Sequence, residues 1–365
     1  MSDEGHMAHA LALAARGLGR TWPNPAVGCV IVRDGRVLGR GWTQPGGRPH
    51  AETRALEQAG DARGATAYVT LEPCAHHGQT PPCASALIGA GITRVVTATT
   101  DPDPRVQGAG HAMLRAACIA VTECVLSEQA LQANAGFFKR VARGLPFVTL
   151  KLATSIDGRI ATASGESRWI TGPLARRYVH GLRLSHDAVL IGSGTALADD
   201  PDLTARDIGA THQPIRIVLD RQLRHDAESR LGRTASQSPV WILHAADSDA
   251  NRIAAWTATG ATLFACAASN NRLDLGEALR ILAGQGLTRV LCEGGGTLGA
   301  ALTGAGLVDE VIHLGAGVVV GAEGVPAIGP LALTSLGDAQ RLRLIDARRL
   351  GHDTLSHWRV IYPVM

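Results

Sequence analysis

Hydrophobic and polar positions follow two different periods along the first 145 residues. Apolar residues recur at helical spacing in His6–Leu18, whereas Val27–Arg33 and Arg36–Gly41 read as strands that flank Asp34-Gly35, a dipeptide typical of tight hairpin turns. The rest of this half continues both patterns, and we expect helices at His50–Ala59, Ala84–Ala90, Ala109–Ala117 and Ser127–Arg143, and strands at Ala65–Leu71, Arg94–Thr99 and Ile119–Val125. Strands that alternate with helices predict an α/β sandwich.

The second half repeats this alternation with different motifs. Gly144-Leu145-Pro146 ends the last helical pattern of the first half, so we place a domain boundary there and expect domains at 1–145 and 146–365. Strands are expected at Phe147–Ala153, Ala188–Gly192, Ile215–Asp220, Val240–His244, Arg289–Cys292, Glu310–Leu314 and Leu355–Tyr362. The polar segment Arg221–Gln237 predicts a surface loop.

Composition narrows the class of protein. The 365 residues suffice for two domains with their own cores, and 45% hydrophobic residues with 18% charged residues are typical of a folded chain. A formal net charge of +3 and 4% aromatic residues argue against a nucleic-acid partner. The most apolar stretch, Val318–Leu336, is interrupted by Glu323, Pro326 and Pro330, which argues against a membrane span. We therefore expect a small-molecule partner, with no nucleic acid and no membrane.

The cysteines and the amino terminus favour a cytoplasmic protein. Seven scattered cysteines form a poor disulfide framework and suit a reducing compartment. Asp3 and Glu4 open the chain where a secretory signal would carry basic residues.

Four residues of the first half have the chemistry of a zinc site. His50, Cys74 and Cys83 offer one imidazole and two thiolates, and such a three-ligand set leaves a fourth position on zinc for water. Zinc lowers the pKa of that water enough to supply hydroxide near neutral pH. Glu52 lies two residues after His50, where it can move protons without binding the metal. This arrangement is typical of zinc nucleobase deaminases.

The spacing of the two cysteines departs from the short deaminase pattern. Eight residues separate Cys74 from Cys83, where the general pattern has two. His76 and His77 lie in this insertion as rival ligands, although we expect them to be loop residues near the substrate.

Glycine and small hydroxyl residues gather at predicted strand ends in the second half. The segments are Lys151–Gly158, Ser164–Thr171, Gly192–Thr195, Ala198–Pro201 and Leu203–Arg206. Such residues allow a phosphate-rich ligand to approach the backbone closely. Glu293-Gly294-Gly295-Gly296-Thr297-Leu298-Gly299 follows a strand and precedes a helix, which predicts a phosphate-binding loop; a simple glycine-rich turn is the alternative. Asp309 comes too early for the ribose-binding acid of a Rossmann fold.

Three motifs together resemble one family. They are Pro23-Asn24-Pro25-x-Val27-Gly28, Pro49-His50-Ala51-Glu52, and the run from Thr70 to Cys83 that includes the long loop between the cysteines. The chain resembles the bifunctional riboflavin-biosynthesis deaminase–reductases over nearly its whole length. The resemblance implies a cytidine-deaminase-like α/β/α sandwich in which His50, Cys74 and Cys83 bind zinc and Glu52 shuttles protons. It also implies a phosphorylated ribosylaminopyrimidine, 2,5-diamino-6-(5-phosphoribosylamino)pyrimidin-4(3H)-one, as the substrate that loses its 2-amino group, and contact of Asn24 with the pyrimidine.

For the second half, the same resemblance implies a dihydrofolate-reductase-like α/β domain that uses NADPH to reduce the ribosyl group of 5-amino-6-(5-phosphoribosylamino)uracil to ribityl. The implied cofactor contacts are Ala153, Trp169, Thr195, Asp199, Gly295, Gly296, Thr297, Leu298, Gly299, Ala300 and Ala301. The implied substrate contacts are Ser167, Arg183, Leu203, Arg206 and Glu293. Guanidinium groups suit phosphate, although Arg183 and Arg206 also read as ordinary surface arginines. We further expect a homo-oligomer.

Two positions depart from the family's usual residues. Thr43 stands where a histidine is usual, and Gln79 stands where a basic residue often follows His-His-Gly. These departures put the deaminase contacts to ribose phosphate in doubt, and Arg48 is a candidate to compensate.

Lysine is scarce in this chain, which makes Lys151 notable. Of 35 basic residues only Lys139 and Lys151 are lysine. We hypothesise that Lys151 and Glu293 meet across the reductase site as partners that handle the ribose hydroxyls or the open-chain carbonyl. NADPH supplies hydride there, and a nearby acid must supply a proton. A structurally paired lysine at the end of a strand is the alternative.

Two competing functions remain. A nucleic-acid deaminase would act on a flipped base, but the balanced charge and sparse aromatics oppose it and the glycine-rich half has no place in it. A zinc-stabilised scaffold would usually have four protein ligands, and this chain offers three and an acid unless His76 or His77 binds.

Overall fold

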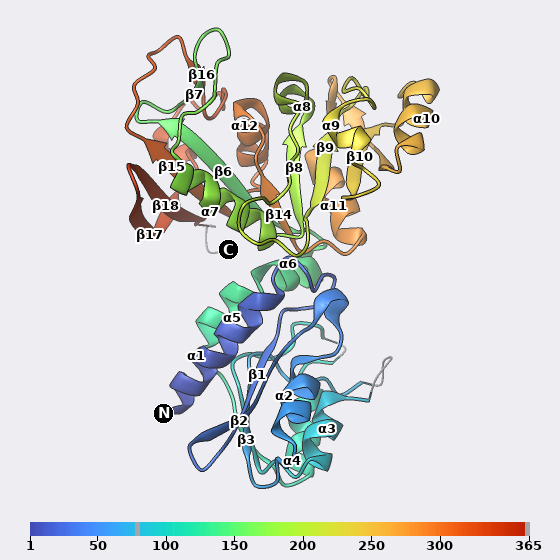
Figure 1. Ribbon diagram of the computed structural model, residues 1–365, viewed down its shortest axis with the longest axis vertical. Coiled ribbons are helices and arrows are strands. Elements are labelled where there is room, and N and C mark those ends of the chain that lie inside the picture. The colour runs from blue at the N-terminus through green and yellow to red at the C-terminus, as the bar shows by residue number, and fades with distance from the viewer. Residues whose placement is uncertain (77–80, 105, 362–365) are drawn as a thin grey trace. The chain divides into compact units, whose positions relative to one another are not determined.

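The computed structural model describes residues 1–76, 81–104 and 106–361 (Figure 1). The chain forms two compact units, Met1–Leu145 and Pro146–Met365. Within the described residues, no helix combines the length and the apolar character needed to cross a membrane.

The first unit is built on a five-stranded sheet. In spatial order its strands are β2 (Arg36–Trp42), β1 (Gly28–Arg33), β3 (Thr66–Val69), β4 (Arg94–Thr97) and β5 (Ala120–Thr122). Strand β1 runs antiparallel to both neighbours, whereas β3, β4 and β5 are mutually parallel. All five strands fall where the hydrophobic pattern predicts them.

Helices cover both faces of this sheet. One face packs against α1 (Asp3–Ala14) and α5 (Ser127–Ala133), and the other against α2 (Ala51–Ala59), α3 (Cys83–Gly89) and α4 (Ala109–Ala116). Alternate residues of β1 serve the two cores: Cys29 and Ile31 point to one face, Val30 and Val32 to the other. The α/β/α sandwich is confirmed.

Glycine lets α2 approach β2 closely. A Cβ atom at Gly41 would lie 2.0 Å from the backbone oxygen of Ala51, and one at Gly39 would lie 2.0 Å from that of Ala55. Because no larger residue fits, these glycines fix the position of α2 and of His50, which caps its amino-terminal end.

The single helix expected over Ser127–Arg143 is wrong. The segment forms α5 and then α6 (Ala135–Arg143), which are separated at Asn134. The buried Asn134 side chain accepts a hydrogen bond from the backbone nitrogen of Ala26 and donates one to the backbone oxygen of Ala26, both at 2.9 Å. This tertiary contact takes precedence over continuation of the helix.

The second unit contains a nine-stranded sheet. In spatial order its strands are β11 (Thr262–Cys266), β10 (Val240–Ala245), β9 (Ile215–Leu219), β8 (Ala188–Gly192), β14 (Arg289–Cys292), β6 (Phe147–Ser155), β15 (Glu310–Ala316), β18 (Asp353–Val360) and β17 (Leu342–Leu350). The seven strands from β11 to β15 are parallel. Strand β18 runs antiparallel to both of its neighbours, β15 and β17. The parallel strands end at one edge, where ligand sites of such sheets form.

Further helices and short strand pairs complete this unit. The helices are α7 (Pro173–Leu184), α8 (Ser193–Asp199), α9 (Arg230–Arg233), α10 (Ala250–Ala258), α11 (Leu275–Gly284) and α12 (Gly296–Gly304). Two small sheets pair β7 (Arg159–Ala161) with β16 (Val325–Pro326), and β12 (Ala268–Ser269) with β13 (Arg272–Leu273). Single 3₁₀ turns occur at Ala15–Gly17, Pro45–Gly47 and Leu336–Asp338.

Arg221–Gln237 is not the simple surface loop that its polarity predicts. It contains α9, and Leu223, Leu231 and Ala235 are buried in the core under β8, β9 and β10, with Ala227 packed partly buried against it. Isolated apolar positions among polar ones gave no periodic signal that would have indicated this packing.

Candidate active sites

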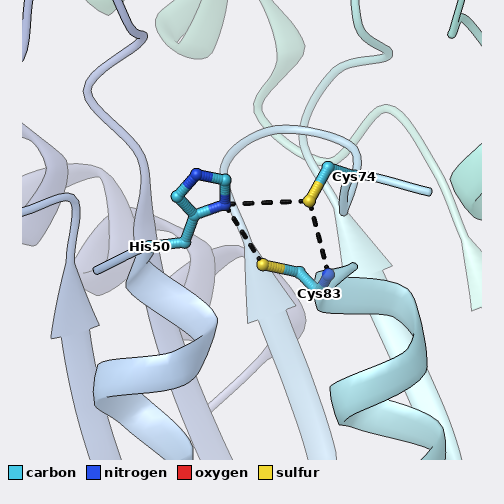
Figure 2. A group of neighbouring side chains, drawn as sticks. All are labelled: His50, Cys74 and Cys83. Carbon is cyan, nitrogen blue, oxygen red and sulfur yellow. Dashed lines mark hydrogen bonds between the residues drawn. The ribbon is translucent and has the colours of Figure 1, made fainter. Parts of the chain in front are cut away.

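Three predicted ligands meet in the first unit. His50 precedes α2, Cys74 follows β3, and Cys83 is the first residue of α3. Their side chains point toward one another (Figure 2). The His50 Nδ1 atom lies 3.3 Å from Cys83 Sγ and 3.7 Å from Cys74 Sγ, and the three ligand atoms lie within 4.8 Å of one another.

This cluster fits a zinc ion. A tetrahedral zinc with ordinary bond lengths separates imidazole nitrogen from sulfur, and sulfur from sulfur, by about 3.5–3.8 Å. The two nitrogen–sulfur distances, 3.3 and 3.7 Å, are close to the value for zinc, and one nitrogen with two sulfurs is a donor set that zinc prefers. Among the described residues, no fourth histidine, cysteine or carboxylate joins the cluster. A three-ligand site is typical of catalytic zinc rather than structural zinc.

Electrostatics favour a thiolate at Cys74. The largest effect on Cys74 comes from the Cys83 side chain, and His50 adds to it. The backbone N–H of Cys83, 3.3 Å from Cys74 Sγ, also contributes. Together these partners lower the pKa of Cys74 to about 4. Deprotonated sulfur is the form that binds metal.

Glu52 lies in the first turn of α2, two residues after His50, and is 3% exposed. Burial raises the pKa of this carboxyl to about 6 in the metal-free protein, because removal from water disfavours the charged form. The ligand cluster and a buried carboxyl are therefore adjacent, as the sequence predicts.

The sequence also places other residues of this unit near the substrate. His76 is exposed and lies outside the three-residue cluster, while His77 and Gln79 fall outside the described residues. Thr43 is buried, and its hydroxyl accepts a hydrogen bond from the backbone nitrogen of Val27 at 2.9 Å. The Asn24 amide donates to the backbone oxygen of Gly46 at 3.4 Å.

Glu72 has a role that the sequence did not reveal. Its carboxylate accepts hydrogen bonds from the backbone nitrogens of Asp101, Gly108, Gly110 and His111 at 2.8–3.2 Å. It therefore anchors α4 and the loop before it to the strand end that carries Cys74. Its place in Glu-Pro-Cys was the only sequence signal.

The second unit gathers three charged side chains from different elements: Lys151 from β6, Glu293 just after β14, and Arg183 near the end of α7. Lys151 lies in the middle of its strand, so the expected position at a strand end is wrong. Arg183 donates two hydrogen bonds to the Glu293 carboxylate, at 2.6 and 2.9 Å, and Lys151 Nζ lies 4.0 Å from Glu293 Oε2. The predicted meeting of Lys151 and Glu293 is thus present in the geometry, but Arg183 is the closer partner of the carboxylate.

Burial and charge act in opposite directions in this cluster. Burial alone would raise the pKa of Glu293, but Arg183 and Lys151 lower it to about 2. Burial lowers the pKa of Lys151, and Glu293 only partly offsets this. A lysine with a lowered pKa releases its proton more readily than an exposed lysine does.

The loop after α8 joins this cluster. Arg183 Nη1 donates to the backbone oxygen of Thr204 at 2.7 Å, next to the predicted substrate contact Leu203, which is buried with a φ of 55°. Arg206 is half-exposed and pairs with Asp202 at 2.6 Å. Ser167 lies in the segment between β7 and α7.

The predicted phosphate-binding loop lies at the amino-terminal end of α12. Gly295 caps this helix, and its backbone nitrogen donates to the hydroxyl of Thr195 in α8 at 3.1 Å. A Cβ atom at Gly295 would lie 3.6 Å from Thr195 Oγ1 and 4.0 Å from Ile160 Cδ1, which is ordinary packing contact, and Gly295 itself is partly exposed. Helix amino termini and exposed backbone of this kind fit the diphosphate of a dinucleotide.

The remaining cofactor candidates differ in exposure. Trp169 is 68% exposed, with the Arg176 guanidinium 4.6 Å from its ring centre. Asp199 ends α8 and accepts a hydrogen bond from Arg168 on its backbone oxygen, and Ala153 lies in β6 opposite Leu314 of β15. Within Gly296–Ala301, Thr297 is exposed whereas Gly296, Gly299 and Ala300 are buried.

Two family models match the chain. The cytidine and deoxycytidylate deaminase zinc-binding region matches residues 1–99, and the RibD C-terminal domain matches residues 146–356.

Proteins of known name are similar over almost the full length. The riboflavin biosynthesis protein RibD of Escherichia coli is 43% identical to this chain, and the match covers 98% of this chain and 99% of the E. coli protein. The structure of Acinetobacter baumannii RibD has a TM-score of 0.88 at 38% identity and covers 99% of both chains. A Thermotoga maritima structure, described as a diaminohydroxyphosphoribosylaminopyrimidine deaminase/5-amino-6-(5-phosphoribosylamino)uracil reductase, has a TM-score of 0.86 at 34% identity and covers 98% of this chain and 99% of its own.

Proposed function

The chain belongs to the RibD family of riboflavin-biosynthesis enzymes, and from this premise we propose how its two units divide a deamination and a reduction. The first unit hydrolyses the 2-amino group from 2,5-diamino-6-(5-phosphoribosylamino)pyrimidin-4(3H)-one. The second reduces the ribosyl group of 5-amino-6-(5-phosphoribosylamino)uracil to ribityl with NADPH. The observation that carries the assignment is the cluster of His50, Cys74 and Cys83 beside a buried Glu52.

In the deaminase unit, His50, Cys74 and Cys83 would hold zinc. Bound zinc makes water a nucleophile near neutral pH. Glu52 takes the proton of the attacking water and delivers it to the departing amino nitrogen, so that ammonia leaves as a neutral molecule. Burial of Glu52 keeps bulk water from competing for this proton. Asn24 contacts the pyrimidine and orients it.

In the reductase unit, NADPH supplies hydride. Lys151 supplies the accompanying proton to the sugar as the hydride arrives, and Glu293 holds its ammonium group in place. The two hydrogen bonds from Arg183 fix the Glu293 carboxylate, which limits the positions open to Lys151. Leu203 and Arg206, next to the Thr204 carbonyl that Arg183 binds, contact the substrate, together with Ser167.

Gly295 and the first turn of α12 would hold the diphosphate of the cofactor, and Thr195 supports that turn through its hydrogen bond with Gly295. Ala153, Trp169 and Asp199 line the same cofactor site.

The protein acts on a small molecule in the cytoplasm, as a homo-oligomer, without a nucleic-acid or membrane partner. All seven cysteines are free, which suits a reducing compartment. The formal charge of +3 offers little attraction to a polyanion.

One assay tests both reactions. The protein is incubated with zinc and the diaminopyrimidine phosphate, with and without NADPH. We expect ammonia release in both cases and NADPH oxidation only after ammonia release. Removal of zinc should abolish ammonia release and leave reduction of the already deaminated substrate intact. Failure of both steps with the zinc-loaded protein would overturn the proposed function.

A further inference from the structure

Two side-chain amides hold irregular backbone next to the proposed substrate contacts. In the first unit, the Asn134 amide accepts a hydrogen bond from the backbone nitrogen of Ala26 and donates one to the backbone oxygen of Ala26, both at 2.9 Å. In the second unit, Gln213 Oε1 accepts from the backbone nitrogen of Ala205 at 2.7 Å, and Gln213 Nε2 donates to the backbone oxygen of Ala205 at 3.0 Å. Each amide therefore pairs with both polar backbone groups of one alanine.

These alanines depend on partners from elsewhere in the chain. Ala26 and Ala205 are both buried, and neither lies in a helix or a strand. Buried backbone groups must be paired, and a side-chain amide offers a donor and an acceptor in one plane, as a neighbouring strand does. The double pairing therefore fixes the backbone of each alanine in one position.

The fixed alanine of the first unit lies two residues after Asn24, the proposed pyrimidine contact. Pro23 and Pro25 flank Asn24, and each proline ring restricts the backbone dihedral φ of its residue. The Asn24 side chain also packs closely on Gly47, because a Cβ atom there would lie 2.0 Å from Asn24 Nδ2. Little freedom remains between Ala26 and Asn24, so a shift of Ala26 would move the Asn24 amide.

The fixed alanine of the second unit lies between two groups of the proposed substrate site. The backbone oxygen of Thr204 accepts the hydrogen bond of Arg183 at 2.7 Å, and Arg206 is a proposed substrate contact. Leu203 has a φ of 55°, a left-handed conformation that costs free energy in a leucine and persists only where the surrounding contacts hold it. The amide pairing at Ala205 holds the same segment two residues further along.

We propose that Asn134 and Gln213 are positioning residues, each of which holds the substrate-binding segment of its own unit. This inference rests on the proposed function, in which Asn24, Leu203 and Arg206 contact the substrates. Neither amide is among the residues proposed to contact zinc, NADPH or substrate, so each acts through the backbone that it binds. Loss of one amide should weaken the binding of one substrate and leave the other reaction unchanged.

Steady-state kinetics of ammonia release by the full chain test the first position. For Asn134→Ala we expect KM for the diaminopyrimidine phosphate to rise about 10- to 30-fold, as for loss of two hydrogen bonds, while kcat stays within about threefold and the zinc content stays normal. General damage to the fold would instead lower kcat and zinc content together. Asn134→Leu fills about the same space without the hydrogen bonds, and it should raise KM in the same way.

A double substitution tests whether Asn134 acts through Asn24. Asn24→Ala should raise the same KM. Addition of Asn134→Ala should then raise KM by less than about threefold more, because the contact that Asn134 positions is already absent. Effects of the two substitutions that multiply in full would contradict the inference.

Gln213→Ala is the matched variant of the other unit. We expect KM for the deaminated compound to rise by a similar factor, while kcat and KM for NADPH stay within about threefold. Ammonia release by Gln213→Ala and NADPH oxidation by Asn134→Ala should be normal. Gln285→Ala, which removes an exposed amide just after α11, is the control and should change neither reaction.

The outcomes separate this inference from the proposed function. A normal KM in Asn134→Ala or in Gln213→Ala, or weaker binding of both substrates in either variant, would overturn the positioning roles. Failure of the unaltered protein to release ammonia or to oxidise NADPH would instead contradict the proposed function.

Discussion

At the scale of single residues, the two sites differ in how far the sequence revealed them. His50, Cys74 and Cys83 have chemistry and spacing that predict a zinc cluster, and their ligand atoms do lie together. The double hydrogen bond between Arg183 and Glu293 joins residues 110 positions apart, and no local pattern indicates such a contact. Nor did any local pattern indicate that Glu72 would accept four backbone hydrogen bonds.

Lys151 provides a direct test of the reductase mechanism. We expect Lys151→Arg to lower kcat for reduction by about 100-fold or more, because a guanidinium is a poor proton donor and cannot occupy the position of an ammonium. Lys139→Arg, which alters the only other lysine, is the control and should reduce at the normal rate. NADPH oxidation with the deaminated substrate measures both. Full turnover by Lys151→Arg would exclude the proposed role.

Glu310 should make the second unit sensitive to acid. Burial alone would raise the pKa of this carboxyl. The His357 Nε2 atom, 2.9 Å from Glu310 Oε2, opposes this effect together with Arg289 and Thr149, and the pKa of Glu310 falls from 4.5 to about 2. A lowered folded-state pKa stabilises the protein above pH 4.5, here by about 3 kcal/mol, and the effect is lost as the pH falls toward 2.

Denaturant unfolding of Glu310→Gln should show this pH dependence. The variant should be less stable than the unaltered protein at pH 7. The difference should shrink as the pH falls from 4.5 toward 2, because Glu310 of the unfolded chain then takes up a proton while Glu310 of the folded protein is still charged. Glu228→Gln, at an exposed position of the same unit, should show no such change. A difference that stays constant from pH 7 to pH 3 would refute the role assigned to the Glu310 charge.

At the scale of elements, most strands could be predicted because they are buried and regular. Strands β8 and β14 have the predicted bounds. Strand β17 was missed because its side chains face solvent along most of its length, including Arg343, Asp346 and Arg348, so no apolar alternation marks it. It forms only through pairing with β18, which lies next to it in the sheet.

The approach of α2 to β2 predicts a coupling between packing and metal binding. Gly41→Ala would place a methyl group 2.0 Å from the backbone oxygen of Ala51, so α2 must move and take His50 and Glu52 with it. We expect a loss of about 1–3 kcal/mol in stability and less than one zinc retained per chain after dialysis.

Gly89→Ala is the control for this prediction, because nothing lies within 4 Å of a Cβ atom at this position of α3. It should keep its zinc and be unchanged or slightly more stable, since alanine favours helix. Metal analysis and thermal unfolding measure both variants. Full zinc content in Gly41→Ala at normal stability would show that the close packing does not position the site.

At the scale of the whole molecule, two compact units carry two different chemistries. Each has its own sheet and its own cluster of reactive side chains, and every residue proposed for deamination lies before Leu145 while every residue proposed for reduction follows Pro146. The two lists of residues share no member, so each reaction should be removable without loss of the other.

The most direct measurement is therefore a pair of single substitutions assayed for both reactions. Glu52→Gln should release no ammonia from the diaminopyrimidine phosphate, yet oxidise NADPH at the normal rate when given the deaminated compound. Lys151→Arg should release ammonia at the normal rate and oxidise almost no NADPH. Loss of both activities in either folded variant, or retention of ammonia release in Glu52→Gln, would contradict the division of labour proposed for the two units.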